Sequence, residues 1–109
     1  MKRDAFGSYR EFWAFYVGEH RRPLTRRLHF IGTTGAIFGI AAAIIFANVW
    51  LLVLAPVFAY GLAWAGHFWV EKNSPATFRY PLWSLLADFH MYALMLTGRM
   101  DDEVRRHAE

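Results

Sequence analysis

The sequence predicts an all-α integral membrane protein: a helical hairpin of two spanning helices, with one amphipathic interfacial helix before it and another after it. The run from Leu28 to Val70 contains no Asp, Glu, Lys or Arg. As one helix it would be roughly 65 Å long, about twice the thickness of a ~30 Å hydrocarbon core, so two helices fit it better. Asn48 is the only strongly turn-prone residue near its middle, and a fold there returns His67 to the depth of His29.

Composition and charge placement agree with a single membrane domain over residues 1–109. Hydrophobic residues make up 56% of the chain, and the formal net charge is +3. Every Lys and Arg lies before Leu28 or after Val70, and none lies near Asn48. The positive-inside rule therefore predicts that both termini are cytoplasmic and that the turn lies outside. Because the basic residues flank apolar helices, we expect them to meet anionic lipid headgroups and not nucleic acid.

Several chemistries are excluded by residues that the chain lacks. It has no cysteine, which rules out disulfides, thiolate nucleophiles, iron–sulfur clusters and cysteine-ligated zinc. It has no phosphate-binding glycine loop, since Gly32, Gly35 and Gly39 lie within the apolar run. No nucleophile elbow surrounds Ser84, which argues against a serine hydrolase.

Residues 4–20 are predicted to form the first amphipathic helix. One stripe of it carries aromatic residues at helical spacing and ends in a histidine: Phe6, Tyr9, Trp13, Tyr16 and His20. We expect this helix to lie in the membrane interface with that stripe facing inward. Pro23 marks the break that follows it.

The two spanning helices are predicted over residues 26–47 and 49–72. Gly35 and Gly39 have the spacing of tightly crossing helices, and Gly61 and Ala65 repeat that spacing in the second helix. We therefore expect the two helices to approach closely. Pro56 is expected to kink the second helix or loosen one of its turns.

Residues 81–97 are predicted to form the last helix, with Pro81 at its first position and Gly98 as its C-terminal cap. Asp88 and His90 make it a poor spanning segment, so we expect it to cover the open end of the hairpin at the cytoplasmic interface. These two residues are two positions apart and point to different sides, so at most one of them faces a site there. Residues 99–109 are expected to be a charged, solvated tail.

The hairpin gathers metal-ligating side chains at its cytoplasmic end. His20 ends the first helix, His29 lies near the start of the first spanning helix, and Glu71 follows His67 by four positions near the end of the second. Histidines with a carboxylate are the ligands of non-haem iron oxygenases, and zinc accepts the same donors. The alternative is that interfacial histidines bind lipid headgroups or cap helices, and spacing alone does not decide between the two.

Two blocks of the sequence resemble a family of small membrane proteins, over nearly the whole chain. The first block holds Glu19-His20, Pro23 and the run RRLHFIGT from Arg26, and the second extends from Gly66 to Met100. Fungal members are endoplasmic-reticulum iron(II)-dependent dioxygenases of fatty acid α-oxidation, which shorten a 2-hydroxy fatty acid by one carbon. Bacterial members, usually labelled a domain of unknown function, are the branch that residues 72–98 resemble. The resemblance implies iron binding by His20, His29 and His67, whereas His90 departs from the family pattern.

We therefore expect a membrane-bound iron(II)-dependent dioxygenase-like protein that acts on a fatty acyl substrate, with dioxygen as co-substrate. The reaction implied is α-oxidation of 2-hydroxy fatty acids. The expected metal ligands are His20, His29, His67 and Glu71. The substrate carboxylate is expected to meet one of three arginines: Arg26, Arg27 or Arg79.

Two other functions stay open at this point. One is a non-catalytic membrane hairpin that scaffolds partners or binds lipid, and the other is a zinc-dependent lipid hydrolase. Each would sit in the inner membrane of a bacterium or the endoplasmic reticulum of a eukaryote, with both termini cytoplasmic.

Overall fold

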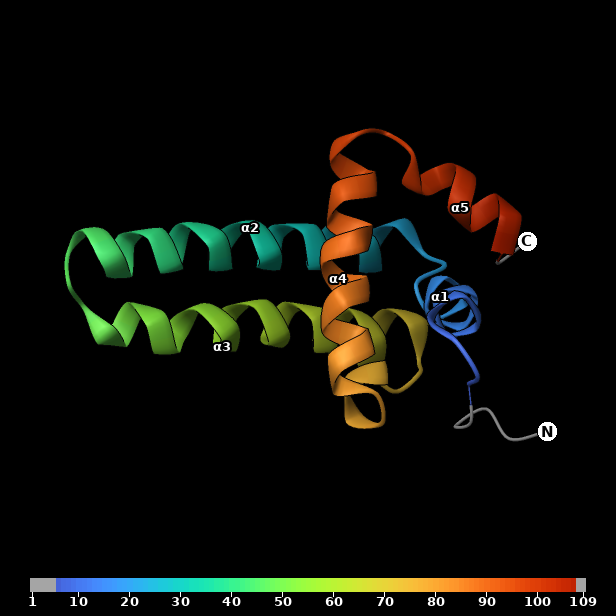
Figure 1. Cartoon of the computed structure of the whole chain (residues 1–109), viewed down its shortest axis with the longest axis horizontal. Coiled ribbons are helices and arrows are strands. Elements are labelled where there is room, and N and C mark those ends of the chain that lie inside the picture. The colour runs from blue at the N-terminus through green and yellow to red at the C-terminus, as the bar shows by residue number, and fades with distance from the viewer. Residues whose placement is uncertain (1–5, 108–109) are drawn as a thin grey trace.

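The computed structural model describes residues 6–107, so residues 4–5 of the predicted first helix and residues 108–109 of the predicted tail lie outside the described residues. The described part of the chain is helical and contains no strand (Figure 1). Its elements in chain order are α1 (Tyr9–Gly18), α2 (Pro23–Ile45), α3 (Val49–Ala65), the π-helix η1 (Gly66–Glu71), the 3₁₀-helix η2 (Ala76–Phe78), α4 (Pro81–Leu96) and α5 (Met100–His107). The predicted all-α class is confirmed.

The helices α2 and α3 form the predicted hairpin, which lies along the horizontal axis of Figure 1. The turn is where the sequence predicts it, because the Asn48 side chain caps α3 by accepting a hydrogen bond from the Trp50 N–H at 3.0 Å. Pro23 begins α2 instead of preceding it, since proline is tolerated in a first turn, where its missing N–H has no helical partner. With 23 residues, α2 is roughly 35 Å long.

Small residues let the two helices of the hairpin touch. A Cβ added at Gly32 would lie 3.0 Å from the carbonyl oxygen of Ala59, and one added at Gly35 would overlap the Phe58 ring. The glycine face of α2 therefore serves the close helix approach that the sequence predicts.

Both arms of the hairpin are long and apolar enough to cross a membrane. These arms are Pro23–Ile45 and Val49–Glu71, and each has a mean hydropathy of 1.8. Their large side chains point away from the protein: Phe38, Ile44 and Trp50 are 70%, 76% and 69% exposed. An apolar surface of this extent is a surface for lipid or for a partner.

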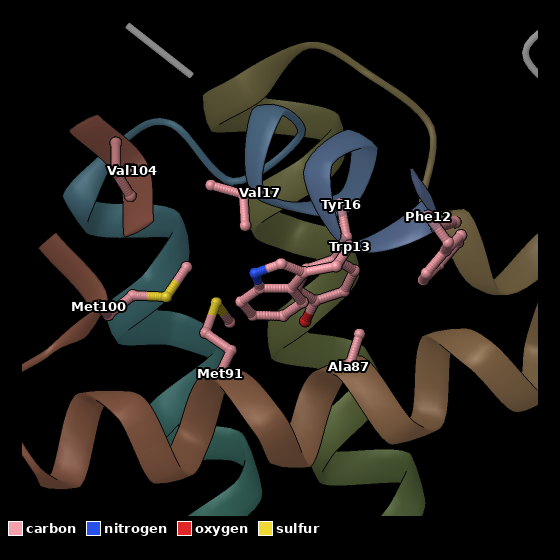
Figure 2. Packing of buried hydrophobic residues seen from close by; sticks show 9 residues of the cluster. Phe12, Trp13, Tyr16, Val17, Ala87, Met91, Met100 and Val104 are labelled. Carbon is pink, nitrogen blue, oxygen red and sulfur yellow. The ribbon is translucent and has the colours of Figure 1, made fainter. Parts of the chain in front are cut away.

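The other helices pack together at the open end of the hairpin. They share one apolar cluster, shown in Figure 2, to which α1, α4 and α5 contribute Phe12, Trp13, Tyr16, Val17, Ala87, Met91, Met100 and Val104. As Figure 1 shows, α4 crosses the hairpin near this end, where the predicted covering helix was expected. It is joined to α2 by a hydrogen bond of 2.8 Å between the Thr34 and Tyr92 hydroxyls.

The structure differs from the prediction of a solvated tail after residue 99. Residues 100–107 form α5, in which Met100 and Val104 are only 3% and 7% exposed. They lie one turn apart and pack into the cluster beside α1, so burial of this short apolar stripe holds the helix in place. Acidic residues in its first turn and basic residues in its last complement the helix dipole.

Candidate metal centre

Three histidines from separate elements meet at the open end of the hairpin. His20 follows α1, His29 lies in the second turn of α2, and His67 lies in η1. Each offers a ring nitrogen, and these atoms all lie within 4.8 Å of one another. Their exposed fractions are 1%, 6% and 2%, respectively. The convergence predicted for His29 and His67 is thus present, and α1 delivers the third imidazole.

Backbone carbonyl groups orient the first two rings. His20 Nδ1 lies 2.7 Å from the carbonyl oxygen of Tyr16, and His29 Nδ1 lies 3.0 Å from that of Thr25. In both cases the acceptor belongs to the residue four positions earlier. Because a carbonyl oxygen only accepts, Nδ1 carries the hydrogen in each ring and Nε2 presents a lone pair.

A side chain orients the third ring in the same way. His67 Nδ1 lies 2.7 Å from Oδ1 of Asn73, whose Nδ2 donates to the carbonyl oxygen of Glu19 at 3.1 Å. The second bond identifies which end of the Asn73 amide is oxygen, so His67 also donates from Nδ1 and presents Nε2. Histidine ligands of metals characteristically donate their other ring N–H to an oxygen, and all three histidines here do so.

The spacing of the bare nitrogens fits one small ion. His20 Nε2 and His29 Nε2 lie 3.1 Å apart, where two lone pairs repel unless a cation lies between them. Burial lowers the pKa of His20 well below its ordinary value, and nearby His29 and His67 lower that pKa further, so a proton is disfavoured there. Two nitrogens bound to one ion at ~2.0–2.1 Å lie about 2.9–3.4 Å apart. The histidines line a cavity of about 10 Å³, and this donor set suits a first-row metal.

A phenol and a carboxylate stand beside the histidines. The Tyr16 ring stacks on His20 with centroids 4.0 Å apart, and its hydroxyl donates to Asp88 Oδ1 at 2.5 Å. Asp88 lines the same cavity as the three histidines, and burial raises the pKa of its carboxyl to about 6. His90 instead stacks on Trp13, with centroids 3.8 Å apart. Of the two polar residues of α4 that the sequence left open, Asp88 is the one that faces the site.

Comparison with known families agrees with this geometry. A family model described as "2-hydroxy-palmitic acid dioxygenase Mpo1-like" matches residues 6–100. The chain belongs to the Mpo1-like family. No curated protein and no solved structure matches it. The family resemblance predicted from the two sequence blocks is confirmed, and the Mpo1-like description is compatible with three converging histidines.

Glu71 lies outside the group of converging nitrogens in this Mpo1-like chain. Its Oε2 accepts a hydrogen bond from the Arg22 N–H at 2.6 Å, which ties the end of η1 to the start of α2. The sequence argument placed Glu71 beside His67 by α-helical spacing. In the structure the Glu71 carboxylate, at the last residue of the π-helix η1, turns to the Arg22 N–H and not to the histidine nitrogens. Ligation by Glu71 stays a prediction.

Arg26 is part of the framework that holds His20. Its side chain is buried, and Nη1 donates to the carbonyl oxygens of His20 and Arg21 at 2.7 and 2.9 Å. Its Nη2 also lies 3.6 Å from Asp101 Oδ1 at the start of α5. The guanidinium therefore links the His20 segment to α5.

The other two arginines occupy different surroundings. Arg27 is exposed on α2. Arg79 lines a second cavity of about 360 Å³, which shares Pro75 and Ala76 with the histidine cavity. Binding of a substrate carboxylate by Arg26, Arg27 or Arg79 stays a prediction.

Sequence reasoning missed the groups that orient the histidines. The sequence analysis gives Asn73 no role, and the carbonyl groups of Tyr16 and Thr25 cannot be recognised from residue type. A usable signal did exist for Asn73, which lies two residues after Glu71 inside the block that resembles the family.

Proposed function

We propose that this Mpo1-like protein is a membrane-embedded iron(II)-dependent dioxygenase that converts a 2-hydroxy fatty acid to the acid one carbon shorter. One observation carries the proposal: three buried imidazoles each donate from Nδ1 to an oxygen and turn Nε2 toward a common centre. The family description supplies the substrate class. When bound, iron(II) would supply a template for the substrate oxygens and the redox chemistry that dioxygen requires.

The residues around the centre have separable tasks in this proposal. His20, His29 and His67 hold the ion through Nε2. Tyr16 and Asn73 keep two of those rings in orientation, so that the site is formed before substrate arrives. Asp88, held by the Tyr16 hydroxyl, is placed to accept a hydrogen bond from a substrate hydroxyl group. We retain Arg79 as the proposed partner of the carboxylate, because its cavity adjoins the histidine cavity.

We further propose that the hairpin spans a bilayer with both termini on the cytoplasmic side. The two apolar arms and the placement of all basic residues beyond Leu28 and Val70 support this orientation. The centre then lies at the membrane surface, where an amphiphile reaches it without leaving the lipid. Reporter fusions at Asn48 and at the two ends should place Asn48 opposite both ends. A result that puts the two ends on opposite sides removes the two-span topology.

The decisive experiment measures metal and oxygen together. The protein is purified without a histidine tag or chelators, placed in lipid nanodiscs, and assayed for bound metal and for oxygen uptake with 2-hydroxypalmitate. We expect iron-dependent uptake, an acid product one carbon shorter, and loss of both metal and uptake in His67→Ala. Iron-loaded protein that consumes no oxygen with any of a broad panel of lipids contradicts the proposal and leaves the scaffold function standing.

A zinc-dependent lipid hydrolase is the second candidate, and one observation favours it. The group of converging donors consists of three histidines, a set that catalytic zinc sites also use. This candidate predicts stoichiometric zinc in the purified protein and lipid cleavage that proceeds equally well without oxygen.

A further inference from the structure

An apolar groove runs along the hairpin from the histidines toward the turn. Its volume is about 290 Å³, and it lies between α2 and α3 with α4 across one end. One face of α2 lines it at helical spacing, through His29, Thr33, Ala36 and Ile40. The facing side of α3 contributes Leu52, Pro56, Ala59 and Ala63. The middle of the groove is thus bordered by small side chains.

The groove is continuous with the candidate metal centre. His29, Tyr60, Ala63 and Asp88 line both the groove and the histidine cavity. From His29 to Ile40 the groove follows α2 for roughly 16 Å, about half of a ~30 Å hydrocarbon core. Its polar residues gather at the histidine end, whereas the far end is bordered by aliphatic side chains.

We infer that this groove holds the hydrocarbon chain of the substrate, with the polar head at His29 and Asp88 and the chain end at Ile40 and Leu52. The inference rests on the proposed function, because it places the chain of that substrate. Because the polar residues of the groove lie at one end, an amphiphile fits the groove in one orientation. The groove volume of about 290 Å³ suits one hydrocarbon chain and is too small for the two chains of a phospholipid.

The groove is also open along its far part. Ile40 and Leu52 are 42% and 49% exposed, so a chain enters sideways from the bilayer. Since lipid tails are as apolar as the groove, moving a chain from lipid into it gains little free energy. The role of the groove is to position carbons 1 and 2 at the metal centre. Filling the groove should therefore displace the chain and slow the reaction without changing how much substrate enters the membrane.

The test uses a photoreactive chain end. Protein in nanodiscs is irradiated with 2-hydroxypalmitate carrying a diazirine at its terminal carbon, and the labelled residues are mapped by mass spectrometry. Labelling should concentrate around Ile40 and Leu52. Ala36→Leu fills the groove at mid-length and should lower that labelling by about tenfold. The control is Ala41→Leu, an exposed alanine of the same helix outside the groove, which should label like the parent; bound metal should be equal in all three proteins.

A second pair of variants covers the case in which Ala36→Leu does not fold. Leu52→Trp closes the far end of the groove at a half-exposed position that tolerates a larger side chain, and Leu54→Trp is its control on the lipid side of α3. Leu52→Trp should lower oxygen uptake with 2-hydroxypalmitate and spare that with 2-hydroxyoctanoate. Leu54→Trp should change neither.

The outcomes separate this inference from the proposed function. Equal labelling of the parent and Ala36→Leu, or labelling spread over lipid-facing Phe38 and Ile44, overturns the groove. Oxygen uptake that neither Ala36→Leu nor Leu52→Trp alters overturns it as well, and leaves the dioxygenase intact. Labelling confined to the groove in a protein that consumes no oxygen would uphold the groove as the site of a single chain and refute the proposed dioxygenase function.

Discussion

Replacement of Asn73 by alanine should weaken metal binding although Asn73 is not a proposed ligand. The change removes the oxygen that lies 2.7 Å from His67 Nδ1 and frees that ring, which is only 2% exposed, to rotate or exchange its hydrogen between nitrogens. Loss of such an outer partner typically lowers metal affinity by about 10–100-fold, or about 1.4–2.7 kcal/mol. The cost of leaving a buried donor unpaired, about 1–3 kcal/mol, independently gives the same range.

The local backbone should survive this substitution. The Asn73 backbone N–H donates to the carbonyl oxygen of His67 at 2.9 Å, and the alanine variant keeps this bond. Besides the bond to His67, the variant loses the side-chain bond to the Glu19 carbonyl. The variant should therefore keep its helical content while its metal affinity falls.

The assay is a competition titration against a chromophoric chelator, on protein purified without a histidine tag. Asn73→Asp restores an oxygen acceptor for His67 and should recover most of the affinity. Asn48→Ala removes an asparagine from the far turn of the hairpin and should leave the affinity at the parental value. Unchanged affinity in Asn73→Ala, or equal losses in the alanine and aspartate variants, would refute the argument that the His67 hydrogen bond prepares the site.

Three other predictions follow from the same geometry. His67→Ala should abolish stoichiometric metal binding and leave helicity nearly unchanged in circular dichroism, because a buried polar ligand adds little stability without its metal. Gly35→Leu should lower the thermal midpoint of unfolding, since a Cβ there would overlap the Phe58 ring; Gly61→Leu, with no atom within 4 Å of the added Cβ, should be nearly neutral. The Asp88 carboxyl has its pKa raised from 3.8 to about 6 by burial, so the metal-free fold binds an extra proton between those values and loses stability as pH rises through them. Asp88→Asn should flatten that part of a melting-temperature profile and, at pH 8, gain roughly 3 kcal/mol relative to the parent; identical profiles for the two proteins would contradict this cause.

The candidate metal centre depends on contacts between segments that are distant along the chain. Arg26 fastens the His20 segment through two carbonyl groups and approaches Asp101 of α5. Asn73 fastens His67 and reaches the carbonyl of Glu19. Each of the two side chains thus joins a histidine to a different part of the fold, which helps to hold His20 and His67 in place.

The sequence by itself determined the hairpin and its main consequence. The run without charged residues is, as a helix, about twice as long as a hydrocarbon core is thick, so it is expected to fold back once. The fold lies at Asn48, whose side chain caps the returning helix. Equal sequence distances from that turn then bring His29 and His67 together, because both arms have the same rise per residue. The role of His20 is predicted from its place on the aromatic stripe of the first helix, and the structure buries the end of that stripe, Trp13, Tyr16 and His20.

Only the tertiary structure decided how the site is completed. The Glu71 carboxylate binds the Arg22 N–H and does not join the converging nitrogens, and residue spacing does not reveal that partner. The choice of Asp88 over His90 depends on which side of α4 meets the hairpin, and α5 forms because two buried side chains find a partner surface on α1. The hydrogen bonds that fix the imidazoles come from Asn73 and from backbone carbonyl groups, and a carbonyl group has the same identity at every position of a sequence. The sequence shows which residues can bind a metal, but the orientation of their side chains depends on hydrogen-bond partners that come together only in the folded protein.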